Sequence, residues 1–216
     1  WKESATAGLD IITWAGNETA KTISHNLSAV PHWIIVKVRG TAKQWTCYHK
    51  DMTADPNNAG IFLQSTAVPT TGTAGYFNNT VPTSSVFSVG TSTNVNQNSD
   101  NVMGYCWTSI QGFSKFGEYT GNGNADGPFI YTGFRPAWFM TKRTDAVGDW
   151  RIRDVKSEPG QPLDAPLYAN TNIAANDGDN DWDVVSNGLK MRGSGTGENA
   201  SGGTYIYAAF AEAPLV

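Results

Sequence analysis

The strongest constraint on the fold of this 216-residue chain is that its second half repeats its first. Aligning the chain with itself at a shift of 105 residues gives seven identities between positions 14 and 45, and two of them are tryptophans. Self-similarity of this kind predicts two copies of one structural unit. The identical pairs are Gly16 and Gly121, Asn17 and Asn122, Ala20 and Ala125, Pro31 and Pro136, Trp33 and Trp138, Lys37 and Lys142, and Trp45 and Trp150.

The shift changes further along the chain. It shortens to 98 where residues 86–90 fall on residues 184–188, and lengthens to 103 where Met103 falls on Ile206 and Trp107 on Phe210. Both changes lie in polar stretches, at residues 67–83 and 91–98, where surface loops tolerate insertions and deletions. We therefore predict two domains, residues 1–111 with a lead-in at 1–9, and residues 112–216.

Each copy contains about seven short runs of β-forming residues separated by turn residues. Runs of this length and number are typical of a small sandwich, and no window shows a sustained helical periodicity. The predicted fold is all-β, with two tandem antiparallel β-sandwich units of jelly-roll or lectin-like type and little helix. The expected strands are 10–14, 22–26, 32–39, 44–49, 61–65, 85–89 and 102–109 in the first copy, and 116–120, 128–131, 137–143, 150–154, 167–169, 183–186 and 204–211 in the second.

Alternation along the strands predicts which faces are buried. In the run 33–39, Ile34, Val36 and Val38 share one face, which we assign to the core. The other face begins apolar and ends charged, as expected if a loop or the sister copy covers part of it. In the run 205–211 both faces are apolar, so this strand is expected to be buried on both sides, at a place where the copies could meet.

Composition excludes several classes of function. The formal charge is −4, and the few clusters of basic residues, such as Arg151 with Arg153, are isolated and interleaved with acids, so we expect no nucleic-acid binding. No apolar run approaches the ~20 residues that span a bilayer, so no membrane insertion is expected. The chain begins without Met or a charged-then-apolar leader, which predicts a piece of a longer protein. Cys47 and Cys106 lie in apolar runs and are expected to be buried free thiols, with a bridge between them left open.

No catalytic residue is predicted. The three histidines, His25, His32 and His49, all lie in the first copy, and no Gly-x-Ser-x-Gly nucleophile motif accompanies them. Structural roles are therefore expected, and His25 in Ser-His-Asn-Leu fits a corner held by side-chain hydrogen bonds. Glycoside cleavage needs two carboxylates about 5 to 10 Å apart, and no two acids occupy matching positions in both copies.

Two weaker site candidates remain. Asp177, Asp179 and Asp181 alternate as calcium ligands do, but the Gly and Glu of a calcium-binding loop do not follow in register, so a solvated turn is the favoured interpretation and no cofactor is predicted. Aromatic residues in loops, namely Tyr76, Phe77 and Trp182, are candidates for stacking on a sugar, with core packing the favoured alternative.

Several motifs distributed along the chain form a distinctive set. They are Thr22-Ile-Ser-His-Asn-Leu27, Pro82-Thr-Ser-Ser-Val-Phe-Ser-Val-Gly90, Gly104-Tyr-Cys-Trp107, Tyr119-Thr-Gly-Asn-Gly123, Thr132-Gly-Phe-Arg-Pro136 and Gly203-Thr-Tyr-Ile-Tyr207. This set resembles a repeat found in tail-fibre and other virion structural proteins of tailed phages, many from marine hosts. The resemblance covers nearly the whole chain.

The resemblance implies a module on the phage tail or particle surface, trimeric when part of a fibre, that contacts other virion proteins. It also implies binding to host surface polysaccharide or a spacer role. The sequence thus favours a non-enzymatic structural and adhesion module. A fibre-borne polysaccharide depolymerase and a decoration protein without a receptor stay open as alternatives.

Overall fold

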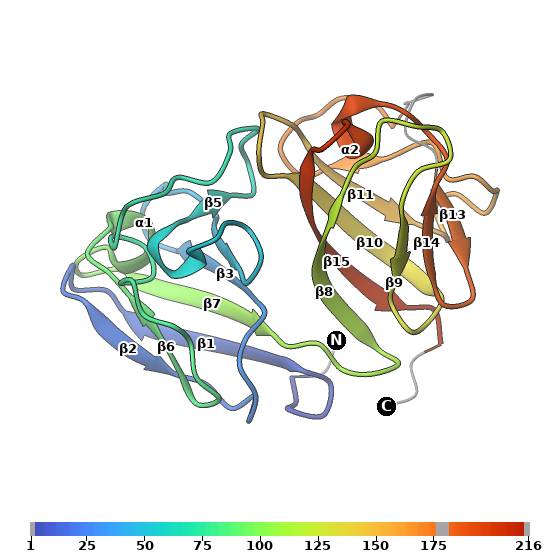
Figure 1. The fold of residues 1–216 in the computed structure, drawn as a ribbon. Helices are drawn as coiled ribbons and strands as arrows, with labels where there is room; N and C mark the ends of the chain where they lie inside the picture. Colours follow the sequence, from blue (N-terminus) through green and yellow to red (C-terminus); the bar gives the residue numbers. More distant parts are fainter. Residues whose placement is uncertain (1–2, 176–181, 214–216) are drawn as a thin grey trace. The chain divides into compact units, whose positions relative to one another are not determined.

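A computed structural model of the chain describes residues 3–175 and 182–213. The chain divides into two compact units (Figure 1): unit 1 comprises Trp1–Gln64 and Pro69–Ile110, and unit 2 comprises Ser65–Val68 and Gln111–Val216. The division after Ile110 lies one residue before the expected boundary. The short segment Ser65–Val68 belongs to unit 2, although in the sequence it lies in the middle of the first copy. The repeat alone did not indicate this assignment.

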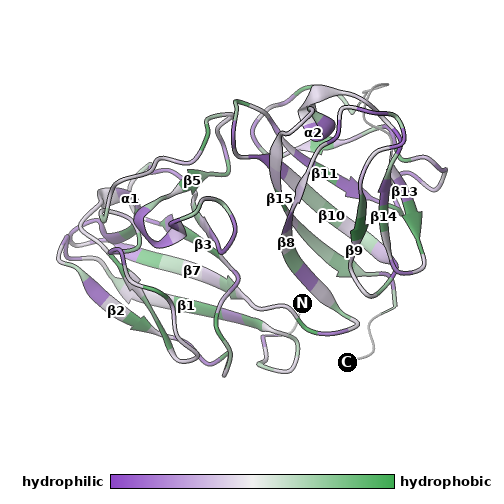
Figure 2. Cartoon of the chain, viewed as in Figure 1, coloured by the Kyte–Doolittle hydropathy of each residue, from purple (hydrophilic) through white to green (hydrophobic). Residues whose placement is uncertain are grey.

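The fold is all-β, as predicted, and every pairing between the named strands is antiparallel. Helix within the described residues is limited to three short segments, η1 Pro56–Asn58, α1 Thr93–Asn96 and α2 Thr196–Asn199. No described helix is long and apolar enough to cross a membrane. Hydrophobic residues concentrate on the strands, and hydrophilic residues occupy much of the connecting loops (Figure 2).

Unit 1 pairs a large sheet with a small one. The large sheet has the order β1-β7-β3-β4-β5, and the small sheet consists of β2 and β6. The two sheets pack face to face, because Trp14 of the large sheet meets Phe87 of the small one edge to face, with ring centroids 5.9 Å apart. The strands are β1 Leu9–Ala15, β2 Lys21–Ser24, β3 Trp33–Val38, β4 Thr46–His49, β5 Ile61–Phe62, β6 Val86–Val89 and β7 Asn101–Trp107.

Unit 2 repeats this plan. Its large sheet has the order β12-β11-β10-β15-β8, and its small sheet has the order β13-β14-β9. The core lies between them, where Trp182 of the small sheet meets Tyr119 and Phe139 of the large one. The strands are β8 Ser114–Thr120, β9 Phe129–Tyr131, β10 Pro136–Arg143, β11 Trp150–Asp154, β12 Leu167–Tyr168, β13 Trp182–Val185, β14 Gly188–Met191 and β15 Thr204–Ala211.

Strand pairing corrects part of the sequence alignment between the copies. The 98-residue shift places β6 on β13, but β6 pairs with β2 whereas it is β14 that pairs with β9. The counterpart of β6 is therefore β14, at a shift of 102, and β13 is an extra strand that the described part of unit 1 lacks. By the same pairing β2 corresponds to β9 at a shift of 107, so His25 corresponds to Thr132 rather than to Ile130.

The burial of side chains agrees with the predictions made for residues 33–39 and 205–211 from the alternation of apolar residues. Ile34, Val36 and Val38 are fully buried. In β15 both rows are buried, with Ile206 and Tyr207 as examples from opposite faces. Cys47 and Cys106 are free thiols in the core, and burial raises the pKa of both.

Candidate functional site

Of the three aromatic candidates, Phe77 and Trp182 are buried in the cores of their units, whereas Tyr76 is partly exposed. Phe77 is 1% exposed and meets Tyr48 edge to face, and Trp182 is 0% exposed in the core of unit 2. Tyr76 is half-buried against Phe62, and burial raises the pKa of its hydroxyl. The interpretation of Phe77 and Trp182 as stacking platforms is therefore replaced by the core-packing alternative, because a buried ring cannot meet a ligand.

The calcium candidates Asp177, Asp179 and Asp181 lie outside the described residues. Within residues 3–175 and 182–213, no group of three or more His, Cys, Asp or Glu side chains is arranged to hold a metal ion.

Each histidine makes hydrogen bonds within unit 1, locally for His25 and His49 and across the chain for His32. The backbone N–H of Leu27 donates to His25 Nδ1 (3.4 Å), and His25 Nε2 contacts the Thr83 carbonyl (3.2 Å), so the ring carries its proton on Nε2. His32 Nδ1 lies 2.9 Å from Ser109 Oγ, and His49 Nδ1 accepts from the Asp51 N–H. Each histidine therefore has its own separate partners, as expected for structural roles.

One pair of carboxyl groups in unit 1 is close. A hydrogen bond with Asp10 raises the pKa of the exposed Glu3, and Asp10 is itself buried and accepts from the Asn26 N–H at 2.7 Å. Carboxyl groups that bond directly to each other leave no space for a sugar, because glycosidases separate theirs by about 5 to 10 Å. The pair does not have the geometry of that reaction.

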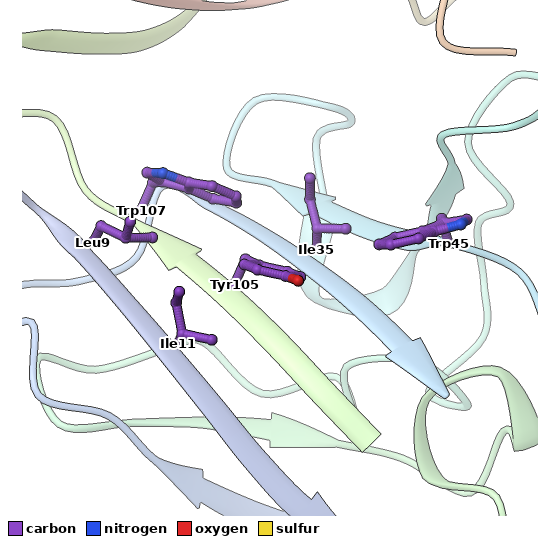
Figure 3. Close-up of a pocket in the computed structure, with 6 residues that line it drawn as sticks. All are labelled: Leu9, Ile11, Ile35, Trp45, Tyr105 and Trp107. Carbon is purple, nitrogen blue, oxygen red and sulfur yellow. The ribbon is translucent and has the colours of Figure 1, made fainter. Parts of the chain in front are cut away.

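An apolar pocket lies on the outer face of the large sheet of unit 1, the face directed away from the core (Figure 3). Its volume is about 370 Å³, which is within the range of small-ligand pockets. The lining side chains come from three strands and the residue before β4: Leu9 and Ile11 of β1, Ile35 of β3, Tyr105 and Trp107 of β7, and Trp45.

Strand register explains why these residues meet. Ile11, Tyr105 and Ile35 are directly paired across β1, β7 and β3, and Leu9 and Trp107 are paired one row further along. Side chains of paired residues point to the same face of a sheet, so the row is continuous. Trp45, which follows the loop from β3, forms the opposite end of the pocket in Figure 3.

Aromatic contacts stabilise the pocket wall. Trp107 stacks on Tyr105 with centroids 6.0 Å apart and on Trp33 with centroids 4.9 Å apart. At the other end, Lys37 Nζ lies 5.4 Å from the ring centre of Trp45. Trp45 is 37% exposed and Ile11 is 39% exposed, so apolar surface remains accessible at both sides of the pocket.

Among the described residues of unit 2, the positions that correspond to the pocket lining differ in size and exposure. Tyr105 corresponds to Ala208, and Trp45 corresponds to Trp150, which is 2% exposed. Lys142, the counterpart of Lys37, donates to the Thr66 carbonyl of the Ser65–Val68 segment (3.1 Å), and burial lowers the pKa of this amine to about 8. The two copies therefore use the same Trp and Lys positions differently.

The core of unit 2 carries a buried ion pair. Arg153 Nη1 lies 2.8 Å from Glu198 Oε2, and both side chains are at most 1% exposed. Thr141 donates to the same carboxylate, and the Tyr119 hydroxyl donates to the Glu198 carbonyl at 2.9 Å. Thr141 and Tyr119, the polar partners of this ion pair, belong to the core of unit 2. We therefore assign the ion pair a structural role.

Sequence reasoning missed the pocket, although one signal was present. The mixed outer face of residues 33–39 indicated that something covers Trp33 and Ile35. It did not indicate that β7 contributes Tyr105 and Trp107 beside them, because that pairing joins residues about seventy positions apart in the chain.

The fold and the pocket define a class: a tandem β-sandwich protein with a ligand-sized apolar pocket on one sheet. The chain belongs to the family described as a domain of unknown function (DUF7483), whose model matches residues 2–214. The match spans both units, so the family model describes the two tandem sandwiches together rather than a single one. No curated protein and no solved structure matched the chain.

Proposed function

We propose that this chain is a non-enzymatic module of a phage virion surface that binds host glycans through the apolar pocket of unit 1. The observation that carries the proposal is the pocket itself, in which Tyr105, Trp107 and Trp45 present aromatic rings to a space of about 370 Å³. The motif resemblance to tail-fibre and virion proteins supports the setting on a phage particle.

The chemistry of the pocket fits one face of a sugar ring. A pyranose has faces made of C–H groups, which pack on aromatic rings, while its hydroxyl groups point outward to solvent and to polar side chains. In the pocket, the rings supply the packing surface, and the ammonium of Lys37, which also donates to the Lys43 carbonyl, lies beside Trp45 at the rim. In a fibre the module would act as a homotrimer alongside other virion proteins, so that several weak sites act together.

Trp45→Ala tests the proposal. Trp45 lies before β4 and is 37% exposed, so its loss should leave the sandwich folded. We expect retention on immobilised host surface polysaccharide to fall at least tenfold, equivalent to about 1.4 kcal/mol. Val81→Ala, which removes another exposed apolar side chain of unit 1, is the matched control and should bind as the parent chain does.

The same assay separates the alternatives. Release of reducing ends during incubation would identify a depolymerase and contradict the non-enzymatic proposal. Equal retention of the parent chain and the Trp45→Ala variant would show that the pocket does not bind the polysaccharide. Absence of retention on any polysaccharide would favour a decoration protein.

A further inference from the structure

Unit 2 displays two aromatic rings on the outside of its small sheet. Phe129 and Tyr131 are 48% and 61% exposed, whereas Ile130 between them is 5% exposed. Alternate residues of a strand point to opposite faces, so both rings stand on the outer face of β9 while Ile130 enters the core. β9 is an edge strand, with β14 as its only neighbour in the small sheet.

A glycine makes room for the Phe129 ring. A Cβ atom at Gly188 would come within 2.9 Å of that ring and still closer to the Ile130 carbonyl oxygen. Gly188 pairs directly with Tyr131 across β14 and β9, so the position beside Tyr131 carries no side chain. The Phe129 ring therefore lies close to the backbone at Gly188 and retains exposed surface.

Charged side chains border the rings. Lys190 pairs with Phe129 in the sheet and contacts Asp126 at 2.6 Å, while Arg192 contacts Asp183 at 2.6 Å. The hydrogen bond from Lys190 lowers the pKa of Asp126, so the carboxylate stays ionised. The border therefore offers donors and acceptors with no net charge.

The corresponding strand of unit 1 lacks these features. Phe129 and Tyr131 correspond to Thr22 and Ser24 of β2, which are exposed and have no ring. The aromatic pair is therefore a property of unit 2 that the shared fold does not require.

We propose that this surface, made of Phe129, Tyr131 and their ion-paired border, is a second carbohydrate site that takes a neutral glycan chain. The inference rests on the proposed function and adds a site and a ligand class to it. Two rings on alternate residues stand roughly 7 Å apart, so they can contact successive sugar units. Balanced charges at the border favour a neutral saccharide over an acidic one, because an acidic chain gains no attraction from cations that are already paired.

A protein partner fits the surface less well. β9 is three residues long, which corresponds to about 10 Å of strand. A specific protein interface covers about 800 Å² on each partner, far more than two rings bordered by charges provide. A second copy of this chain paired along the β9 edge is the alternative that the experiment below excludes or reveals.

The test uses the full chain carrying Phe129→Thr and Tyr131→Ser, which installs the residues of unit 1 at exposed positions. The probes are immobilised maltohexaose, mannohexaose and xylohexaose as neutral ligands and an alginate hexamer as an acidic one. Leu167→Thr, which removes an exposed apolar side chain from β12, is the control. We expect the double variant to lose affinity for a neutral hexamer at least tenfold while the control is unchanged, with little effect of raising salt from 50 to 500 mM.

The outcomes separate the two proposals. If Trp45→Ala weakens binding and the double variant does not, the second site is wrong and the proposed function stands. If neither variant changes binding, or no hexamer binds, both fail. Preference for alginate overturns the ligand class, and a parent dimer that the double variant abolishes, without a change in glycan affinity, identifies the surface as a contact between copies.

Discussion

One corner of the sandwich is built with a histidine in unit 1 and a threonine in unit 2. His25 Nδ1 accepts the Leu27 N–H, and Thr132 Oγ1 accepts the Phe134 N–H, each two residues further on. Leu27 and Phe134 are both buried, so the corner turns an apolar side chain into the core in both copies. Only the histidine can titrate near neutral pH.

Burial lowers the pKa of His25, with the Thr83 carbonyl opposing the shift. A base with a lowered folded pKa binds fewer protons than in the unfolded chain, so stability is lost as pH falls below about 6.5 towards the folded pKa. We expect His25→Thr to lose about 1 kcal/mol at pH 7.5 through the missing Thr83 bond and to show a shallower decline from pH 7 to 5. Urea unfolding at several pH values measures this, and parallel declines in both proteins would contradict it.

The buried ion pair of unit 2 replaces an apolar cluster of unit 1. Arg153, Glu198 and Thr141 correspond to Tyr48, Val95 and Val36, and all three of these are at most 4% exposed. A charge left without its partner in a core is costly, whereas replacing a whole pair with apolar residues is often neutral.

Substitutions at these positions test that asymmetry. We expect Glu198→Gln alone to cost about 3 to 5 kcal/mol, because Arg153 stays charged in the core. The triple change Thr141→Val, Arg153→Tyr and Glu198→Val, which copies unit 1, should recover most of that loss. Urea titration measures the free energy of unfolding of each variant. A triple variant with a lower free energy of unfolding than the Glu198→Gln variant would show that the ion pair itself stabilises the unit.

At the scale of elements, an asparagine at equivalent positions in the two units holds the loop that follows the first strand of each unit. Asn96, at the end of α1, donates through Nδ2 to the carbonyls of Thr19 and Gly90 and accepts from the Asn17 N–H. Asn199, at the end of α2, does the same with Asn124, Gly193 and Asn122. These bonds tie the short helix to the loop after the first strand and to the end of the small sheet.

Aspartate at either position should break this tie. Asn199→Asp removes both donors and places a carboxylate against two carbonyl oxygens, so we expect a loss of about 2 to 5 kcal/mol, and a similar loss for Asn96→Asp. Neither change should alter the strand content seen by circular dichroism at low temperature. Thermal unfolding measures the effect, and a loss below about 1 kcal/mol at both sites would contradict the assigned role.

The elements that sequence could and could not predict differ in a physical way. Strands with alternating apolar residues, such as residues 33–38, follow from local pattern alone. Residues 188–191 were missed as a strand, because Gly188 and Lys190 occupy its outer positions and only Leu189 and Met191 carry the apolar signal. Identity between the copies marked Asn17 and Asn122, but it did not indicate that they bond to Asn96 and Asn199 at the ends of α1 and α2, because these partners lie 79 and 77 positions away in the chain.

At the scale of the molecule, duplication preserved the plan and changed the surfaces. The identical residues Lys37 and Trp45 lie at the open pocket of unit 1, whereas their counterparts Lys142 and Trp150 in unit 2 are buried. Unit 2 in turn has the aromatic strand β9. The candidate sites therefore could not be predicted from the repeat, since each depends on residues that only one copy has.

We propose that this tandem sandwich binds glycans through aromatic surfaces without cleaving them. The most direct measurement is a glycan-array titration of the full chain beside a variant that combines Trp45→Ala, Phe129→Thr and Tyr131→Ser, followed by size analysis of the bound glycans. We expect saturable binding by the parent chain, at least a hundredfold weaker binding by the variant, and glycans of unchanged length. Equal binding by both proteins, or shortened glycans, would contradict the claim.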